Sequence, residues 1–336
     1  MKYYKYFTFI VLIVWFSVMS INELWYLYEN EWPISLTMVF GSFIAGASAE
    51  GGGAVAFPVF TLLFDMSPYT ARNFSFAIQA IGMTSASLLI LGKKIPIDKA
   101  AIKYCGISGI IGLIVGAFLI ADNIPPKEVK LFFVSLWLSF GLVMLFNTFK
   151  KERIVILRIK IDQRKDAIIL ILFGFFGGII SSIFGNGVDI FSFCLLTLYF
   201  RLSEKIATPT SVIIMTINTI VGLFIHVFLL KDFDHKVLGY WLSAAPVALL
   251  CAPLGAFFIS FISRKNIAAF LIFLIFIQFI TAMIIIKPNN VQITLCFLVF
   301  IVGGSLFVAL NKYHKKIKIN NLTSNSDMTK TYNDGF

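Results

Sequence analysis

Two glycine-rich breaks inside apolar sequence are the parts of this chain best suited to bind a small molecule. Their residues are Gly51, Gly52 and Gly53 in the first break and Gly185, Asn186 and Gly187 in the second. Glycine lets a backbone leave helical geometry. A broken helix exposes free N–H groups and the positive end of its dipole, which together bind anions. Close helix packing through small residues is the structural alternative, but the matched pair of breaks favours a binding role.

An acidic residue accompanies each break. Glu50 directly precedes the first break, and Asp189 follows Gly187 by two residues. An acid at membrane depth is costly unless it is paired, protonated or wetted, so both are candidate proton carriers for coupling. The alternative for Glu50 is a structural acid that caps free N–H groups. The alternative for Asp189 is that it simply begins the helix that follows.

Polar residues also begin the helices that follow the two breaks. The first set is Arg72, Asn73, Ser75 and Gln79, and the second is Thr208, Thr210 and Ser211. Arg72 could clamp a carboxylate or sulfonate through two hydrogen bonds, or extend along the membrane interface as an ordinary snorkelling arginine. The stripes either face each other along a substrate path or hydrogen-bond helices together. We interpret His226 as a satisfied interior or interfacial histidine rather than a proton relay.

The composition excludes a soluble protein. Of 336 residues, 59% are hydrophobic and 13% charged, and the mean hydropathy is +0.89, whereas a soluble domain is about a quarter charged. We therefore attribute the net charge of +11 to basic loops on the cytoplasmic side of the membrane rather than to a nucleic-acid-binding surface. The four cysteines and three histidines show no metal-site or disulfide spacing. We accordingly expect no cofactor, no metal and no enzymatic activity.

The apolar runs predict an all-α polytopic membrane protein with about eight full spans. These are 7–28, 71–92, 100–121, 128–149, 206–230, 237–261, 266–286 and 291–311. Two shorter pairs, 34–49/54–64 and 167–184/188–200, flank the breaks and are predicted to be hairpins or half-helices. If both pairs re-enter, 22 Lys and Arg lie on the cytoplasmic side, with both termini, and 6 lie outside, as the positive-inside rule requires. Two short full spans per pair would give the same parity.

A weak internal repeat divides the chain. Gly41–Pro58 is echoed by Gly174–Phe191, Thr70–Phe76 by Ile206–Val212, and Gly116–Phe118 by Gly255–Phe257. Each half holds one hairpin and three spans, so the second half must be inverted. Inverted repeats with matching broken segments are typical of secondary transporters, with the substrate near the midplane where the breaks meet.

This organisation gives six predicted segments. They are a first span with an outer loop (1–33), a first repeat (34–149), a basic cytoplasmic loop (150–166), a second repeat (167–286), a last span (287–311) and a disordered cytoplasmic tail (312–336).

The breaks and the segments after them resemble the sulfite exporter TauE/SafE family of membrane transporters. The resemblance rests on Gly51–Gly53 with Pro58, on Ala71–Ser75, and on the second copies Gly185–Gly187 and Ala207–Ser211. It implies export or uptake of small sulfur-containing or organic anions without ATP hydrolysis. Glu50 and Arg72 are charged where the family is usually less so.

These observations predict a secondary transporter that moves a small anion across the inner membrane by alternating access, with proton coupling as an option. The expected anion is a sulfur oxyanion, a sulfonate or an organic acid, and the other expected partners are membrane lipids. An anion channel is the main alternative, and an intramembrane enzyme is a minor one.

Overall fold

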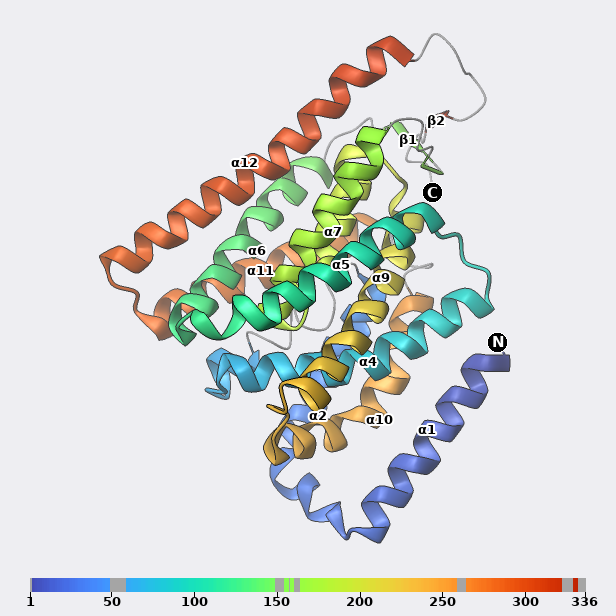
Figure 1. Ribbon diagram of the computed structural model, residues 1–336, viewed down its shortest axis with the longest axis vertical. Helices are drawn as coiled ribbons and strands as arrows, with labels where there is room; N and C mark the ends of the chain where they lie inside the picture. Colours follow the sequence, from blue (N-terminus) through green and yellow to red (C-terminus); the bar gives the residue numbers. More distant parts are fainter. Residues whose placement is uncertain are drawn as a thin grey trace.

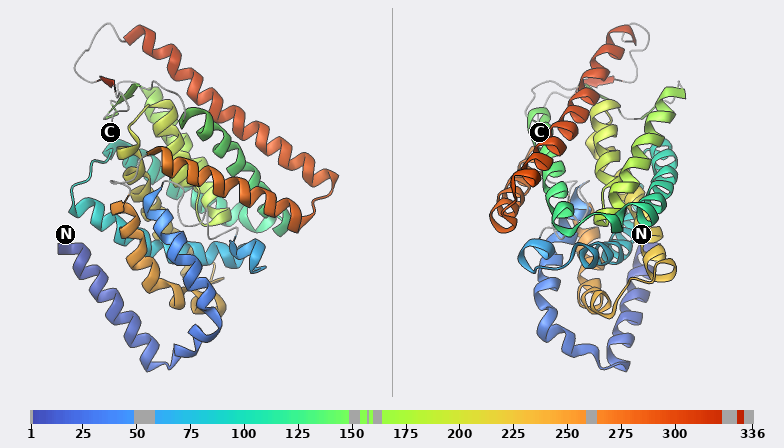
Figure 2. Two further views of the ribbon diagram at one scale, coloured as in Figure 1. Left: turned by 180° about the vertical axis from the view of Figure 1, so that it is seen from behind. Right: turned by 60° about the vertical axis from the view of Figure 1, so that its left-hand side comes forward.

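The computed structural model describes residues 2–48, 59–148, 154–156, 158–159, 164–258, 264–321 and 329–331. It shows an all-α polytopic membrane protein (Figures 1 and 2). The elements in chain order are α1 (Lys2–Ile21), η1 (Leu24–Tyr26), α2 (Leu27–Ala47), η2 (Val59–Leu63), α4 (Pro68–Gly92), α5 (Lys99–Leu119), η3 (Ala121–Asn123), α6 (Pro126–Thr148), β1 (Ile154–Ile156), α7 (Arg164–Phe184), α8 (Val188–Cys194), η4 (Leu195–Tyr199), α9 (Glu204–Phe224), η5 (Ile225–Leu229), α10 (His235–Phe258), α11 (Arg264–Ile286), α12 (Asn290–Asn321) and β2 (Thr329–Thr331).

Among the described residues, seven helices are long and apolar enough to cross a membrane. They are α1, α4, α5 with η3, α7, α9 with η5, α10, and α12 as far as Ala309. The apolar stretch of α4 is 78% buried against 6% for α1. Helix α4 is therefore the centre of the bundle, whereas α1 and α12 lie at its periphery (Figure 1).

Several predicted boundaries move. Helix α1 ends at Ile21 rather than at residue 28, because Glu23 adopts a positive φ of 53° and turns the chain. Helix α7 begins at Arg164 and is 21 residues long, so the prediction that this run is too short to span is wrong. Its charged first turn extends the helix beyond the apolar run.

At the other end of the chain, α12 continues to Asn321, and Thr329–Thr331 pairs antiparallel with Ile154–Ile156, where we expected a disordered tail.

The second break lies where the glycines predicted it. Helix α7 ends at Phe184 and α8 begins at Val188, and α8 with η4 forms a half-length return. The segments before α7 and after η4 lie side by side, since the Ile156 N–H donates to the Arg201 carbonyl and the Ser203 N–H to the Ile156 carbonyl, both at 2.9 Å. The pair formed by α7 and the α8–η4 return therefore begins and ends at the same end of the molecule. Taken together, the two segments do not act as one broken span.

The two repeats interlock in corresponding ways. Helix α5 packs against α7, and its counterpart α10 packs against α2 (Figure 1). The repeated glycines make these close approaches possible. A Cβ on Gly116 would lie 2.1 Å from Ser182 Oγ, and one on Gly255 would lie 1.9 Å from the carbonyl oxygen of Phe43. Each repeat thus places a glycine of one long helix against the pre-break helix of the other.

Candidate functional site

The start of α4 fixes the position of the most unusual side chain in the bundle. Ser67 caps the helix by accepting a hydrogen bond from the Thr70 N–H at 3.1 Å, and Pro68 occupies the first turn. Both features favour a helix start at this point. Arg72 follows one turn later and points away from solvent, with only 2% of its side chain exposed. It is therefore not a snorkelling arginine.

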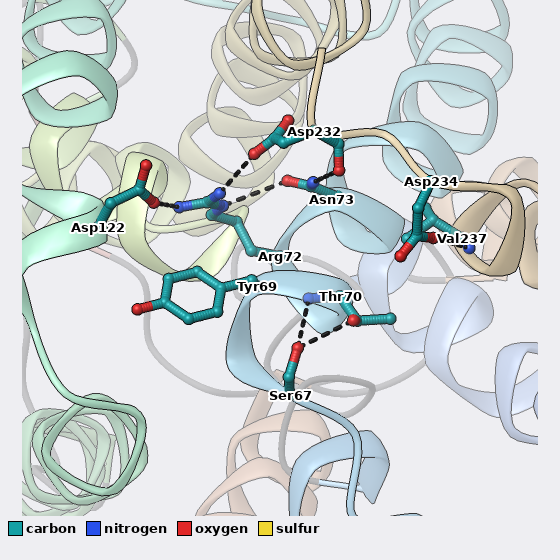
Figure 3. A pocket seen from close by; sticks show the side chains of 9 residues that line it. All are labelled: Ser67, Tyr69, Thr70, Arg72, Asn73, Asp122, Asp232, Asp234 and Val237. Carbon is teal, nitrogen blue, oxygen red and sulfur yellow. Dashed lines mark hydrogen bonds and ion pairs between the residues drawn. The ribbon is translucent and has the colours of Figure 1, made fainter. Parts of the chain in front are cut away.

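Arg72 is held by three acceptors (Figure 3). Its Nη2 donates to Asp232 Oδ2 at 2.9 Å, its Nη1 to Asp122 Oδ1 at 3.2 Å, and its Nε to Asn73 Oδ1 at 3.2 Å. Asp122 lies on η3 between α5 and α6, and Asp232 lies between η5 and α10. One buried guanidinium therefore connects both repeats at this end of the bundle, which we call the outer end.

Asp232 is itself fixed by further contacts. His226 Nδ1 lies 2.9 and 3.0 Å from its two carboxylate oxygens, and Asn73 Nδ2 donates to its backbone carbonyl at 2.9 Å. Burial raises the pKa of Asp232. The hydrogen bond and charge of His226, the charge of Arg72 and the bond from Asn73 lower it by more, so the pKa lies below its ordinary 3.8. Asp232 therefore keeps its negative charge at neutral pH.

These side chains border a cavity of about 390 Å³ (Figure 3). Its lining consists of Ser67, Tyr69, Thr70, Arg72, Asn73, Asp122, Asp232, Asp234 and Val237. Three carboxylates and a single guanidinium line the cavity, and two of the carboxylates, Asp122 and Asp232, are already paired with Arg72. An anion that enters this cavity must compete with an aspartate for Arg72.

The second break lies directly against the same turn of α4. Gly185 and Gly187 have φ values of 79° and 150°. A Cβ on Gly185 would lie 2.6 Å from Ser75 Cβ and 2.7 Å from the Arg72 carbonyl oxygen. Ser75 Oγ and Gln79 Nε2 donate to the Gly185 carbonyl at 3.5 and 3.4 Å, and Gln79 also donates to Ser75. Four predicted residues, Arg72, Ser75, Gln79 and Gly185, therefore lie together.

The backbone donors around α8 are satisfied by the chain itself. Asp189 Oδ1 accepts from the Gly187 N–H at 2.9 Å, and Ser181 Oγ accepts from the Val188 N–H at 2.9 Å. Asp189 thus begins α8, as its alternative reading proposed, and Asn186 is buried beside it. An anion at this break would have to replace these acceptors. A role for Asp189 in proton coupling stays a prediction.

The second predicted polar set lies elsewhere. Thr210 Oγ1 accepts from the Asp98 N–H at 2.9 Å and donates to Ile206, and Ser211 Oγ donates to the Thr208 carbonyl at 2.8 Å. Asp98 also accepts from the Ile159 N–H at 3.0 Å. We call this the inner end.

The inverted repeat explains the separation, because α9 begins at the end where α4 finishes. The two helices meet farther along, where Ser87 Oγ lies 2.8 Å from Thr216 Oγ1. Glu50, Gly51, Gly52 and Gly53 lie outside the described residues.

Sequence reasoning missed the three acidic members of the outer cavity, Asp122, Asp232 and Asp234. A signal existed, since all three fall in loops predicted to lie on the same side as Arg72. In the part of the chain that the structure describes, no group of three or more His, Cys, Asp or Glu side chains could hold a metal ion.

A family model described as "Sulfite exporter TauE/SafE" matches residues 34–282. The chain belongs to the sulfite exporter TauE/SafE family. The match spans both repeats and includes the second break, Arg72, Asp122 and Asp232. TauE/SafE proteins are membrane transporters, so the family confirms the predicted resemblance and the general role in transport. No significant match was found among curated proteins or solved structures.

Proposed function

We propose that this TauE/SafE protein is a secondary transporter that moves a small anion by alternating access. The observation that carries the proposal is the packing of the Gly185–Gly187 break of one repeat against the Arg72 turn of the other. Broken helices at the interface of inverted repeats are where secondary transporters bind substrate. The backbone of Arg72 contacts that break, and its buried guanidinium lines the outer cavity; a guanidinium suits carboxylates, sulfonates and sulfur oxyanions.

In this proposal the two ends open alternately. Contacts of Arg72 close the outer end, and contacts of Asp98 with Thr210 and Ile159 tie the inner end. A carrier needs both sets of contacts, since only one end opens at a time. Proton coupling through Glu50 or Asp189, an inner-membrane location and cytoplasmic termini are further parts of the proposal.

Transport by the purified full-length protein in liposomes tests this function. The probes are radiolabelled sulfite, sulfate, methanesulfonate and acetate, each with and without a proton gradient. A carrier should show saturable uptake of at least one probe, and unlabelled probe inside the liposomes should accelerate entry of the labelled one. No flux for any of the four would contradict the proposal, and ionic currents without such acceleration would favour a channel.

A matched pair of glycine variants tests the role of the break. Gly185→Ala places a Cβ against the Arg72 backbone at a positive φ, and should abolish most transport. Gly304→Ala serves as control, because a Cβ there meets no heavy atom within 4 Å. Equal flux by the two variants would show that the break is not part of the transport path.

A further inference from the structure

The two carboxylates that bind Arg72 differ in how firmly they are held. Asp232 is 33% exposed and makes further contacts to His226 through its carboxylate and to Asn73 through its carbonyl. Asp122 is 61% exposed and reaches Arg72 through one contact of 3.2 Å. It lies on the three-residue turn Ala121–Asn123. One partner of Arg72 is thus built into the fold, and the other is an exposed side chain at the cavity.

We propose that the Asp122 carboxylate occupies the position of the transported anion on Arg72 and is displaced when that anion enters the outer cavity. Asp122 is then an internal competitor that sets the affinity for substrate at this end. The inference rests on the proposed function, anion transport, and identifies a residue that determines its affinity.

The energetics of the exchange are favourable. Asp122 is the exposed side of this pair, at 61% against 2% for Arg72, so it regains water when it leaves, and Arg72 keeps Asp232 as its second carboxylate. The incoming anion offers Arg72 the same kind of charge-assisted bond that Asp122 gave. Because one anionic acceptor replaces another, no unpaired buried charge is created at any stage.

Asp232 cannot take part in the same exchange so readily. Its removal would separate His226 and Arg72 from their shared acceptor and leave buried polar groups unpaired, which is expensive. Asp232 and Asn73 therefore keep the guanidinium oriented while its Nη1 changes ligand. The exchange selects anions whose oxygen atoms resemble a carboxylate, namely carboxylates, sulfonates and sulfur oxyanions.

The cavity supplies a matched control for this proposal. Asp234 lines the same cavity and carries the same charge, but its Oδ1 accepts from the Val237 N–H at 2.7 Å and caps α10. Asn caps a helix start as well as Asp does. Asp234→Asn therefore removes one negative charge from the cavity and leaves both anionic ligands of Arg72 in place, whereas Asp122→Asn replaces one of those anionic ligands by a neutral amide.

The test measures uptake of radiolabelled sulfite and methanesulfonate by full-length wild-type protein, Asp122→Asn and Asp234→Asn. The KM of Asp122→Asn should fall by about fourfold and that of Asp234→Asn by under about twofold. Equal falls would mean that only the cavity's overall charge matters, and a raised KM would mean that Asp122 orients Arg72 for binding; either result overturns the inference alone. Absence of flux in the wild type would instead overturn the proposed function and the inference with it.

Discussion

The outer and inner ends of the bundle hold corresponding connections with different chemistry. Asp234 and Asp98 cap the equivalent helices α10 and α5, accepting from Val237 and Ala101 at 2.7 and 2.9 Å. Around these caps the ends diverge. The internal repeat aligns Arg72 with Thr208, so the outer end has a guanidinium with two carboxylates, whereas the inner end joins Asp98 to backbone amides and a hydroxyl.

This difference predicts that the two ends respond to different conditions. The Arg72 contacts pair a cation with two carboxylates, so an anion in the outer cavity competes for them. The Asp98 contacts with Ala101 and Ile159 are hydrogen bonds from N–H groups, and the Thr210 hydroxyl accepts the third. Two ends related by a repeat therefore need not open in response to the same signal.

The largest effect should come from removal of the guanidinium. Arg72→Gln leaves Asp232 and His226 without their buried cationic partner, so the free energy of unfolding should fall by about 3 to 5 kcal/mol. Denaturant unfolding in mild detergent measures it. Lys127→Gln, at an exposed position in the first turn of α6, is the control for loss of one positive charge. A loss under about 1 kcal/mol would show that the outer network does not stabilise the fold.

Asp232→Asn should make the outer end insensitive to acid. Because the folded pKa of Asp232 lies below 3.8, the wild-type carboxylate contributes stability that is fully present above the unfolded pKa and is lost as pH falls through the folded value. The variant should be less stable by about 2 kcal/mol at pH 7, and the difference should shrink below about pH 4. Melting temperatures of the wild type and the variant, measured from about pH 3 to about pH 8, test this prediction. A difference in stability that stays constant over this range would contradict it.

At the inner end, Asp98→Ala removes an acceptor shared by the Ala101 and Ile159 N–H groups. Loss of the helix cap should cost about 1 to 2 kcal/mol, less than the loss of Arg72. Asp98→Asn, whose single Oδ1 can still cap α5 but cannot also accept from the Ile159 N–H, is the matched variant and should recover the part of the stability that the cap supplies. If both variants lost equal stability, the charge rather than the cap would hold the inner end.

Local patterns predicted the break between Phe184 and Val188, because the backbone geometry of Gly185 and Gly187 is a property of those residues themselves. The repeated Gly116 and Gly255 helped to identify the repeat, and the structure shows that they occupy equivalent close contacts. The ion-pair network could not be found this way, since Asp122 and Asp232 are 50 and 160 residues from Arg72. Such contacts follow from how the helices assemble, which hydropathy does not determine.

The same limit explains why the sequence did not predict on which end of the bundle Thr208, Thr210 and Ser211 lie. Their residue types correctly predicted a polar helix start. They could face the polar residues at the start of α4 only if α4 and α9 began at the same end of the bundle. The inverted repeat places the two helix starts at opposite ends of the bundle. This consequence could have been deduced from the odd number of spans in each half. Charge in the loops and the direction of each helix, combined, would have placed Arg72 with the three aspartates.

The smallest effect concerns the independence of the ends. Thr210→Val removes the acceptor of the Asp98 N–H and should cost about 1 kcal/mol. Thr210 and Arg72 share no contact among the described residues, so the losses in the double variant Arg72→Gln/Thr210→Val should add to within about 0.5 kcal/mol. Denaturant unfolding of the four proteins in this cycle measures the coupling. A coupling above about 1 kcal/mol would show that closure of one end is sensed at the other through α4 and α9, and that the two networks act as a single unit.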